Sequence, residues 1–180
     1  MAHVRGIEDV TVSVHCHNDL GMATALALAG VRAGATQVEC TINGLGERAG
    51  NTAYEDVALS LLTMYGVDTG LKYEKMYELS EMMRKFCGHT IPSNRGIVGP
   101  TLADIESGIV ADWYVNASAE HPLEISPYDY SLVGHPQAKV VIGKMSGIPT
   151  VDIYLDQLGM QCDDKEQKLE IVSKIKEKAF

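Results

Sequence analysis

Apolar residues follow two different periods in the first third of the chain. Residues 10–16, VTVSVHC, alternate in the manner of a strand and are rich in β-branched side chains. Apolar residues at helical spacing follow over 20–32, a second strand pattern covers 35–42, and a second helical pattern covers 52–65. Two strands that alternate with helices through short links predict parallel pairing with right-handed crossovers.

The remaining two thirds of the chain are mainly helical in pattern. Residues 73–88 predict a helix with a Met-rich apolar face, and 102–117 and 163–180 predict two more. A Pro- and Gly-punctuated linker covers 91–101, and a short strand, KVVIG, covers 139–143. We therefore expect an α/β region followed by a helical region, with the boundary near residue 70.

Two histidines lie two residues apart at the end of the first predicted strand. The side chains of residues i and i+2 of a strand point to the same face, and their Cα atoms lie roughly 6.5–7 Å apart. His15 and His17 can therefore converge on one cation, while Cys16 faces the other way. The next strand ends in a glycine-rich loop, residues 43–51, NGLGERAGN. Both segments leave the carboxyl ends of their strands, which predicts a metal site there, with more donors supplied from elsewhere.

Charge and composition narrow the classes of partner. The 180 residues carry a net charge of −9, which argues against a general nucleic-acid or anionic-membrane surface. No apolar run reaches the roughly 18 residues of a membrane span, and the mixed segment after Met1 does not resemble a signal peptide. The four cysteines include no Cys-x-x-Cys pair, which is typical of free thiols in a reducing compartment. We expect a cytoplasmic protein that binds neither nucleic acid nor membrane.

A long motif runs almost without interruption over residues 12–51, VSVHCHNDLGMATALALAGVRAGATQVECTINGLGERAGN. It resembles the signature stretch of the 2-isopropylmalate, homocitrate and citramalate synthase family, which are TIM-barrel acyltransferases related to 3-hydroxy-3-methylglutaryl-CoA lyase. Looser resemblance continues through IPSNRGIVG at 91–99, ESGI at 106–109 and VVIGKMSG at 140–147. The resemblance implies an α/β fold in which residues 1–70 are the last β/α units of a TIM barrel. Residues 71–180 would form a mainly helical α+β accessory region.

The same resemblance implies a reaction and a set of site residues. Members of the family join acetyl-CoA to a 2-oxo acid in a Claisen-type condensation, with a divalent metal holding the oxo acid. His15 and His17 match the two histidine ligands of the family, and Asn51 matches its asparagine ligand. Glu47 and Arg48 fall in the loop near the substrate. Zn, Mn and Mg are all compatible with such a donor set.

Part of the family pattern is missing. Its aspartate ligand and the neighbouring arginine and glutamate belong to the first barrel strand, and this chain has no Asp-Gly dipeptide of that motif. A whole barrel takes roughly 250 residues, so the sequence resembles the carboxyl-terminal part of such an enzyme, entered near the seventh strand. The catalytic residues are therefore unknown, and we do not expect this chain alone to be active. A fragment is the preferred explanation; a partial gene product and a subunit completed by another chain remain open.

The accessory region also departs from the family. Where the family carries histidines around Ser-Gly-Ile and before a second Ser-Gly, this chain has Ile105, Val110 and Met145. These side chains cannot transfer protons, which makes a related carbon–carbon lyase the runner-up. A non-catalytic companion subunit and an unrelated metal-binding module are further alternatives. Candidates for the missing acid–base role are His89, His121 and His135, and Tyr128 and Tyr130 lie in a segment where the family places a tyrosine near the active site.

The same reading predicts association with another chain. A partial barrel leaves sheet edges and apolar helix faces exposed. The helices expected over 73–87 and 102–117 would pack on a second subunit. We expect either a homodimer or completion by an N-terminal half-barrel.

Overall fold

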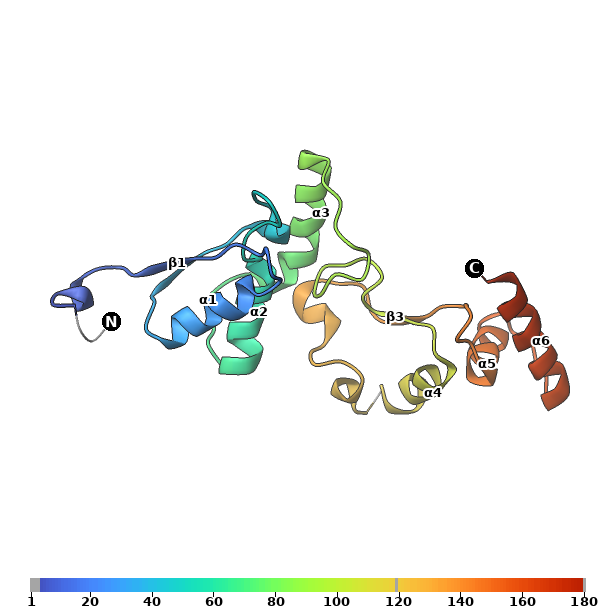
Figure 1. The fold of residues 1–180 in the computed structure, drawn as a ribbon. Helices are drawn as coiled ribbons and strands as arrows, with labels where there is room; N and C mark the ends of the chain where they lie inside the picture. Colours follow the sequence, from blue (N-terminus) through green and yellow to red (C-terminus); the bar gives the residue numbers. More distant parts are fainter. Residues whose placement is uncertain (1–3, 119, 180) are drawn as a thin grey trace. The chain divides into compact units, whose positions relative to one another are not determined.

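The chain forms two compact units, seen in the computed structural model of Figure 1, which describes residues 4–118 and 120–179. The first unit contains the residues up to Leu102 together with Val133–His135, and the second contains Ala103–Leu132 and the residues from Pro136. The division falls later than the boundary predicted near residue 70. The two units differ in their internal contacts, which do not define where a barrel would end. The boundary near residue 70 therefore stays a prediction.

The first unit alternates strands and helices as the sequence predicted. Strand β1 pairs in parallel with β2, and His15 lies opposite Glu39 in the register. Both strands are three residues long, shorter than the patterns suggested. The elements in chain order are η1 Ile7–Asp9, β1 Ser13–His15, α1 Ala23–Arg32, β2 Gln37–Glu39, η2 Ile42–Gly44, α2 Tyr54–Tyr65, η3 Tyr73–Lys75 and α3 Met76–Cys87.

Helices α1 and α2 cover one face of the β1–β2 sheet. Ala27, Leu28 and Val57 are buried there against the half-buried Val14 of β1 and Val38 of β2. A Cβ at Gly30 would lie 2.6 Å from Val14, so the glycine lets α1 approach the strand closely. The side chains that alternate with these valines are exposed on the other face: Ser13, His15, Gln37 and Glu39. The core therefore leaves the polar face of the sheet open.

The second unit is helical around one short strand pair. Strands β3 and β4 pair in parallel, and the N-terminus of α4 lies against the residue that precedes α5. A Cβ at Gly108 would lie 2.8 Å from the backbone of Gly147, so a glycine is needed at this contact. The elements are β3 Asp104–Ile105, α4 Gly108–Ala117, η4 Pro122–Glu124, η5 Tyr130–Val133, β4 Lys139–Val140, α5 Ile148–Gln157 and α6 Lys165–Lys178, with Val133 of η5 belonging to the first unit.

One prediction for this region was wrong, and one helix was missed. The helix expected over 102–117 begins only at Gly108, because residues 104 and 105 form β3 and Ile105 accepts a hydrogen bond from the Val141 N–H (2.8 Å). Helix α5 was not predicted at all. The helix expected over 163–180 is confirmed as α6 over Lys165–Lys178, while residue 180 lies outside the described residues. Asp164 caps the helix by accepting a hydrogen bond from the Glu166 N–H (2.8 Å).

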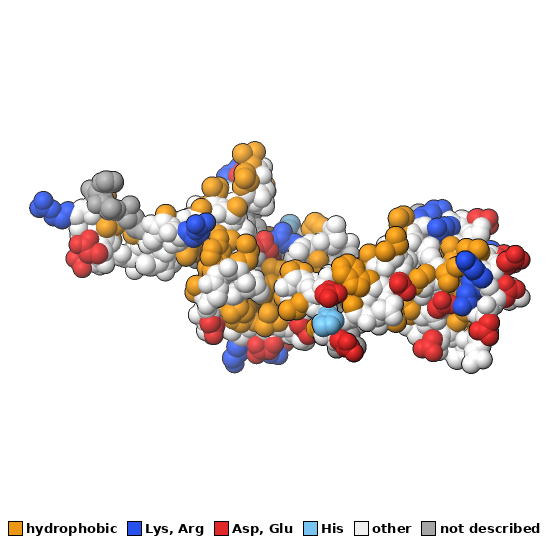
Figure 2. Space-filling model, turned by 90° about the horizontal axis from the view of Figure 1, so that it is seen from below, with side chains coloured by type: hydrophobic (Ala, Val, Ile, Leu, Met, Phe, Trp, Pro, Cys, Tyr) orange, Lys and Arg blue, Asp and Glu red, His pale blue; other side chains and the backbone are white. Residues whose placement is uncertain are grey.

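The face shown in Figure 2 carries charged side chains of both signs and many exposed apolar side chains. Exposed large apolar side chains include Leu20, Met64, Phe86 and Ile109. All four cysteines are free thiols. Within the two described ranges, no helix combines the length and the apolar character that a membrane crossing requires.

Candidate metal centre

The two histidines of the motif converge at the end of β1. The Nε2 atoms of His15 and His17 lie 3.1 Å apart, and the rings meet edge to face with centroids 5.0 Å apart. Two nitrogens that bind one cation at about 2.1 Å each stand roughly 3.0–3.4 Å apart for angles between octahedral and tetrahedral. The pair therefore has the spacing of two ligands of one metal ion.

Backbone hydrogen bonds bring Asn51 beside this pair. Thr52 donates its N–H to the carbonyl of Cys16 (3.0 Å), and Asn51 forms an isolated antiparallel bridge with His17. Side chains of directly opposed antiparallel residues lie on the same side, a few ångströms apart. The Asn51 N–H also donates to the carbonyl of Gly44 (3.0 Å), which closes the loop after β2. Residues 34 positions apart in sequence thus become neighbours through main-chain bonds.

The Asn51 amide oxygen has an unusual environment. Oδ1 of Asn51 is buried and, among the described residues, has no hydrogen-bond partner, as is also true of Nδ1 of His17. A buried acceptor without a partner is costly, and a cation is one group that would satisfy it. Two imidazole nitrogens and one amide oxygen form a donor set that suits Zn, Mn or Mg.

The described part of the chain does not supply a complete set of metal ligands. There, no group of three or more His, Cys, Asp or Glu side chains is arranged to hold a metal ion. His15, His17 and Asn51 therefore fit part of a site, and further donors would have to come from a substrate or from other residues.

Gly46 leaves room for the Asn51 amide. A Cβ at Gly46 would lie 2.5 Å from Oδ1 of Asn51, and the glycine does not need a left-handed backbone. We expect Gly46→Ala to displace the amide and to weaken divalent-metal affinity by about tenfold or more. Gly96→Ala is the matched control, since its Cβ would meet nothing within 4 Å. Equal affinity of the two variants in a metal titration would contradict the placement of Asn51.

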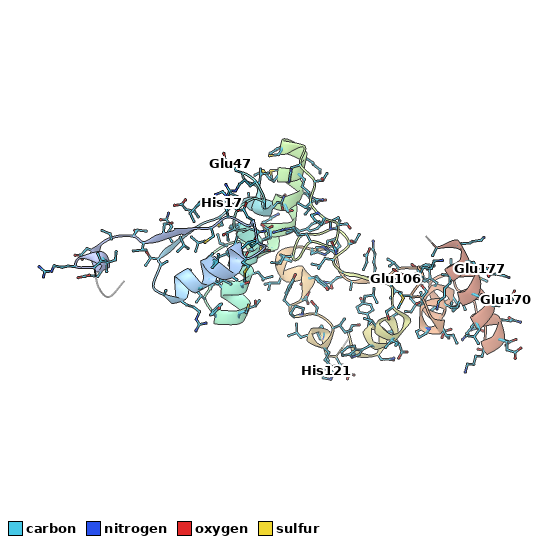
Figure 3. The ribbon with its side chains drawn as sticks, in the orientation of Figure 1. His17, Glu47, Glu106, His121, Glu170 and Glu177 are labelled. Carbon is cyan, nitrogen blue, oxygen red and sulfur yellow. The ribbon has the colours of Figure 1, made fainter. Side chains whose placement is uncertain are left out.

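An ion pair fastens the loop to the residues that follow the histidines. Arg48 donates from Nε and Nη2 to the two carboxylate oxygens of Asp19, at 2.8 and 3.0 Å. These hydrogen bonds lower the pKa of Asp19 below its usual value, although the pair is exposed. The Arg48 backbone is left-handed (φ 57°). Arg48, expected near the substrate, is thus engaged with Asp19, while Glu47 is exposed on the same loop (Figure 3).

A buried polar network holds the loop that follows β2. Glu55 at the start of α2 is 2% exposed and accepts a hydrogen bond from the Asn43 N–H (3.1 Å). The Asn43 amide exchanges hydrogen bonds with Ser80 of α3. Nη2 of Arg95 lies 3.3 Å from Asp56 and 3.6 Å from Glu55. Burial raises the pKa of both carboxyl groups. The network joins the loop to two helices and to the linker.

Sequence reasoning missed several of these residues. Glu39 of β2 lies 3.1 Å from Nδ1 of His15, and neither Glu55 nor Arg95 was singled out. A signal for Glu39 was available, because strand alternation places it on the same face as its register partner His15. No local pattern indicates the Glu55–Arg95 contact, which joins residues 40 positions apart.

The remaining candidates lie elsewhere. His135 is 4% exposed, with Nε2 2.8 Å from the carbonyl oxygen of Gly99 and its ring edge against Tyr77. Tyr128 and Tyr130 contact each other edge to face in the second unit, beside a cavity of about 340 Å³. The other two candidates, His89 and His121, are exposed. None of these positions is tested as an acid or base, so their role stays a prediction.

The first part of the chain matches a known protein family, and nearly the whole chain is similar to known enzymes. Residues 1–83 match the HMGL-like family. The chain is 43% identical to the 2-isopropylmalate synthase of Methanocaldococcus jannaschii, over 93% of this chain and 32% of that protein. It is 39% identical to the homocitrate synthase of Methanopyrus kandleri, over 98% of this chain and 43% of that protein. It is also 39% identical to methylthioalkylmalate synthase 1 of Arabidopsis thaliana, over 92% and 33%.

The predicted resemblance to these synthases is thereby confirmed, whereas the assignment of the chain to the carboxyl-terminal part of a barrel stays a prediction. The chain is related to synthases and spans about a third to two fifths of the length of these relatives. The activity of a whole enzyme is therefore a matter for proposal.

Proposed function

We propose that this chain forms the metal-binding side of a (β/α)8 enzyme that condenses acetyl-CoA with a 2-oxo acid. The observation that carries the proposal is the convergence of the His15 and His17 imidazoles, together with the backbone bridge that joins His17 to Asn51, whose buried amide oxygen has no hydrogen-bond partner among the described residues. The proposal is supported by sequence identities of 43% to a 2-isopropylmalate synthase and 39% to a homocitrate synthase, in alignments that cover 93% and 98% of this chain.

The three side chains would hold a divalent cation, Zn, Mn or Mg. When bound, such an ion supplies Lewis-acid polarisation of the 2-oxo carbonyl. His15 and His17 contribute neutral imidazole nitrogens, and Asn51 contributes a neutral amide oxygen. Because none of the three donors is charged, they leave the charge of the cation uncompensated, which favours an anionic substrate such as a 2-oxo carboxylate.

The loop after β2 would place two more side chains near that substrate. Glu47 and Arg48 lie between Gly46, which accommodates Asn51, and Gly50, which closes the loop. In this proposal Arg48 positions the loop through Asp19, and Glu47 faces the bound oxo acid from the exposed side.

The remaining parts of the barrel would come from another segment or another chain. A barrel needs eight strands, and β1–β2 is a two-stranded sheet whose polar face is open. We propose that the missing strands bring a further metal ligand and the acid–base residues. This chain alone is then inactive, and it acts within a homodimer or a complex with the other half of the barrel.

The test is an assay on the complete protein that contains this chain. Acetyl-CoA and a series of 2-oxo acids are supplied with Zn²⁺, Mn²⁺ or Mg²⁺, thiol release is followed, and products are identified by mass spectrometry. We expect thiol release that depends on both the oxo acid and the metal. Failure of every 2-oxo acid in a metal-loaded protein would contradict the proposal.

A related carbon–carbon lyase is the second candidate. It is favoured by the aliphatic and thioether side chains at Val110 and Met145, where the synthase pattern carries histidines. The same product analysis separates the two, because a lyase would cleave a 3-hydroxyacyl-CoA and would not release CoA from acetyl-CoA.

A further inference from the structure

We propose that Glu39 is a positioning residue that fixes the neutral His15 ring in the tautomer whose Nε2 lone pair points toward the metal. The inference rests on the proposed function, since it concerns the same site. It adds a side chain outside the ligand set.

The contact follows from the register of the sheet. His15 and Glu39 are partners in the parallel β1–β2 pair, and the carboxylate Oε2 lies 3.1 Å from Nδ1 of His15. The other carboxylate oxygen, Oε1, accepts a hydrogen bond from the Ser13 hydroxyl (3.2 Å). Ser13, His15 and Glu39 therefore lie together on the open face of the sheet, with the Ser13 hydroxyl bonded to one Glu39 oxygen and Nδ1 of His15 close to the other.

The chemistry of the pair selects one tautomer. A carboxylate oxygen accepts hydrogen bonds, so its position 3.1 Å from Nδ1 of His15 favours the tautomer that carries the proton on Nδ1. A neutral imidazole has a single N–H, which leaves Nε2 with a free lone pair. That Nε2 is the atom 3.1 Å from Nε2 of His17. A carboxylate on the outer nitrogen also fixes the ring orientation and raises the basicity of the ligating nitrogen.

His15 and His17 differ in what lies next to their Nδ1 atoms. Nδ1 of His17 is buried and has no hydrogen-bond partner among the described residues. Nδ1 of His15 has the Glu39 carboxylate, with the two side chains 46% and 54% exposed. At such exposure a polar contact between two side chains contributes little to folding. Loss of Glu39 should therefore change ligand geometry and leave the fold intact.

The first measurement is a Co²⁺ titration of the 180-residue chain, followed by visible absorption. We expect Glu39→Ala to weaken Co²⁺ affinity by about 10- to 100-fold. Glu39→Gln should have a smaller effect, because its amide oxygen can still accept from Nδ1. Gln37→Ala is the matched control, since Gln37 lies on the same face of β2 and pairs with Ser13. Unchanged affinity in Glu39→Ala would overturn the inference.

The second measurement reads the tautomer without any metal. Long-range ¹⁵N–¹H correlation spectra of the metal-free chain should show a protonated Nδ1 and a bare Nε2 at His15, with a mixture in Glu39→Ala. If His15 has the same tautomer populations in the wild-type chain and in Glu39→Ala, the inference is overturned. If the wild-type chain and the complete protein bind no Co²⁺, the proposed function fails, and the spectra still decide the role of Glu39.

Discussion

Replacing His17 by alanine is expected to abolish divalent-metal binding, and His15→Ala should do the same. Of the three donors that this chain supplies, each variant leaves one imidazole and one amide oxygen, which is too few to retain a cation even with a further ligand from the rest of the protein. We expect affinity to fall by more than about 100-fold, beyond the effect of losing a residue that only orients a ligand. Metal content after dialysis, measured on the complete protein, checks the prediction.

The control separates the site from histidine content in general. His89→Ala removes an exposed imidazole that lies outside the proposed site, and its metal content should equal that of the wild type. His15 is partly exposed, so its loss should change the free energy of unfolding by no more than about 0.5 kcal/mol. Unchanged metal content in either His15→Ala or His17→Ala would refute the assignment of the pair.

Gly50→Ala is expected to cause the largest loss of stability in the loop. Gly50 is buried with φ +89°, and a Cβ there would lie 2.2 Å from the carbonyl oxygen of Gly44. That oxygen already accepts the Asn51 N–H, so it cannot move without releasing Asn51. Left-handed strain and overpacking together should cost about 2–4 kcal/mol of unfolding free energy. Urea denaturation measures this cost.

Gly70→Ala isolates the steric part of that cost. Gly70 is also left-handed (φ +69°), but a Cβ there would meet nothing within 4 Å. Its substitution should cost only the backbone term, about 1–2 kcal/mol. Equal losses in the two variants would mean that the loop backbone does not have the close contact between residues 44 and 50.

Local patterns predicted the elements of the first unit well. Strand alternation and helical spacing gave β1, β2, α1 and α2 in the correct order, and the short links gave their parallel pairing. Strand lengths were overestimated, since only three residues of each strand form the ladder. Apolar periodicity continues beyond the last paired residue, and the ladder depends on a neighbouring strand.

The position of Asn51 could not be derived from local pattern. It reaches His17 through a loop that contains two non-glycine residues in left-handed conformation, Asn43 and Arg48, and through Gly44 and Gly50. Only the family resemblance pointed to Asn51. The supporting contacts of Asn43 with Ser80 and of Glu55 with Arg95 join distant segments, so no spacing rule indicates them.

The second unit was harder to predict for two physical reasons. Residues 104 and 105 carry a helical pattern, but pairing with Lys139 and Val140 draws them into a strand, an instance of tertiary contact overriding propensity. Helix α5 begins with Ile148 and Pro149 after Gly147, and these residues signal a turn when they are considered without their neighbours.

X-ray absorption at the zinc edge of the Zn²⁺-loaded 180-residue chain tests the proposed donor set most directly. We expect scattering from two imidazole rings with nitrogen at about 2.0–2.1 Å and from further oxygen or nitrogen atoms. A sulfur shell at about 2.3 Å, or a first shell without imidazole, would contradict a centre built from His15, His17 and Asn51.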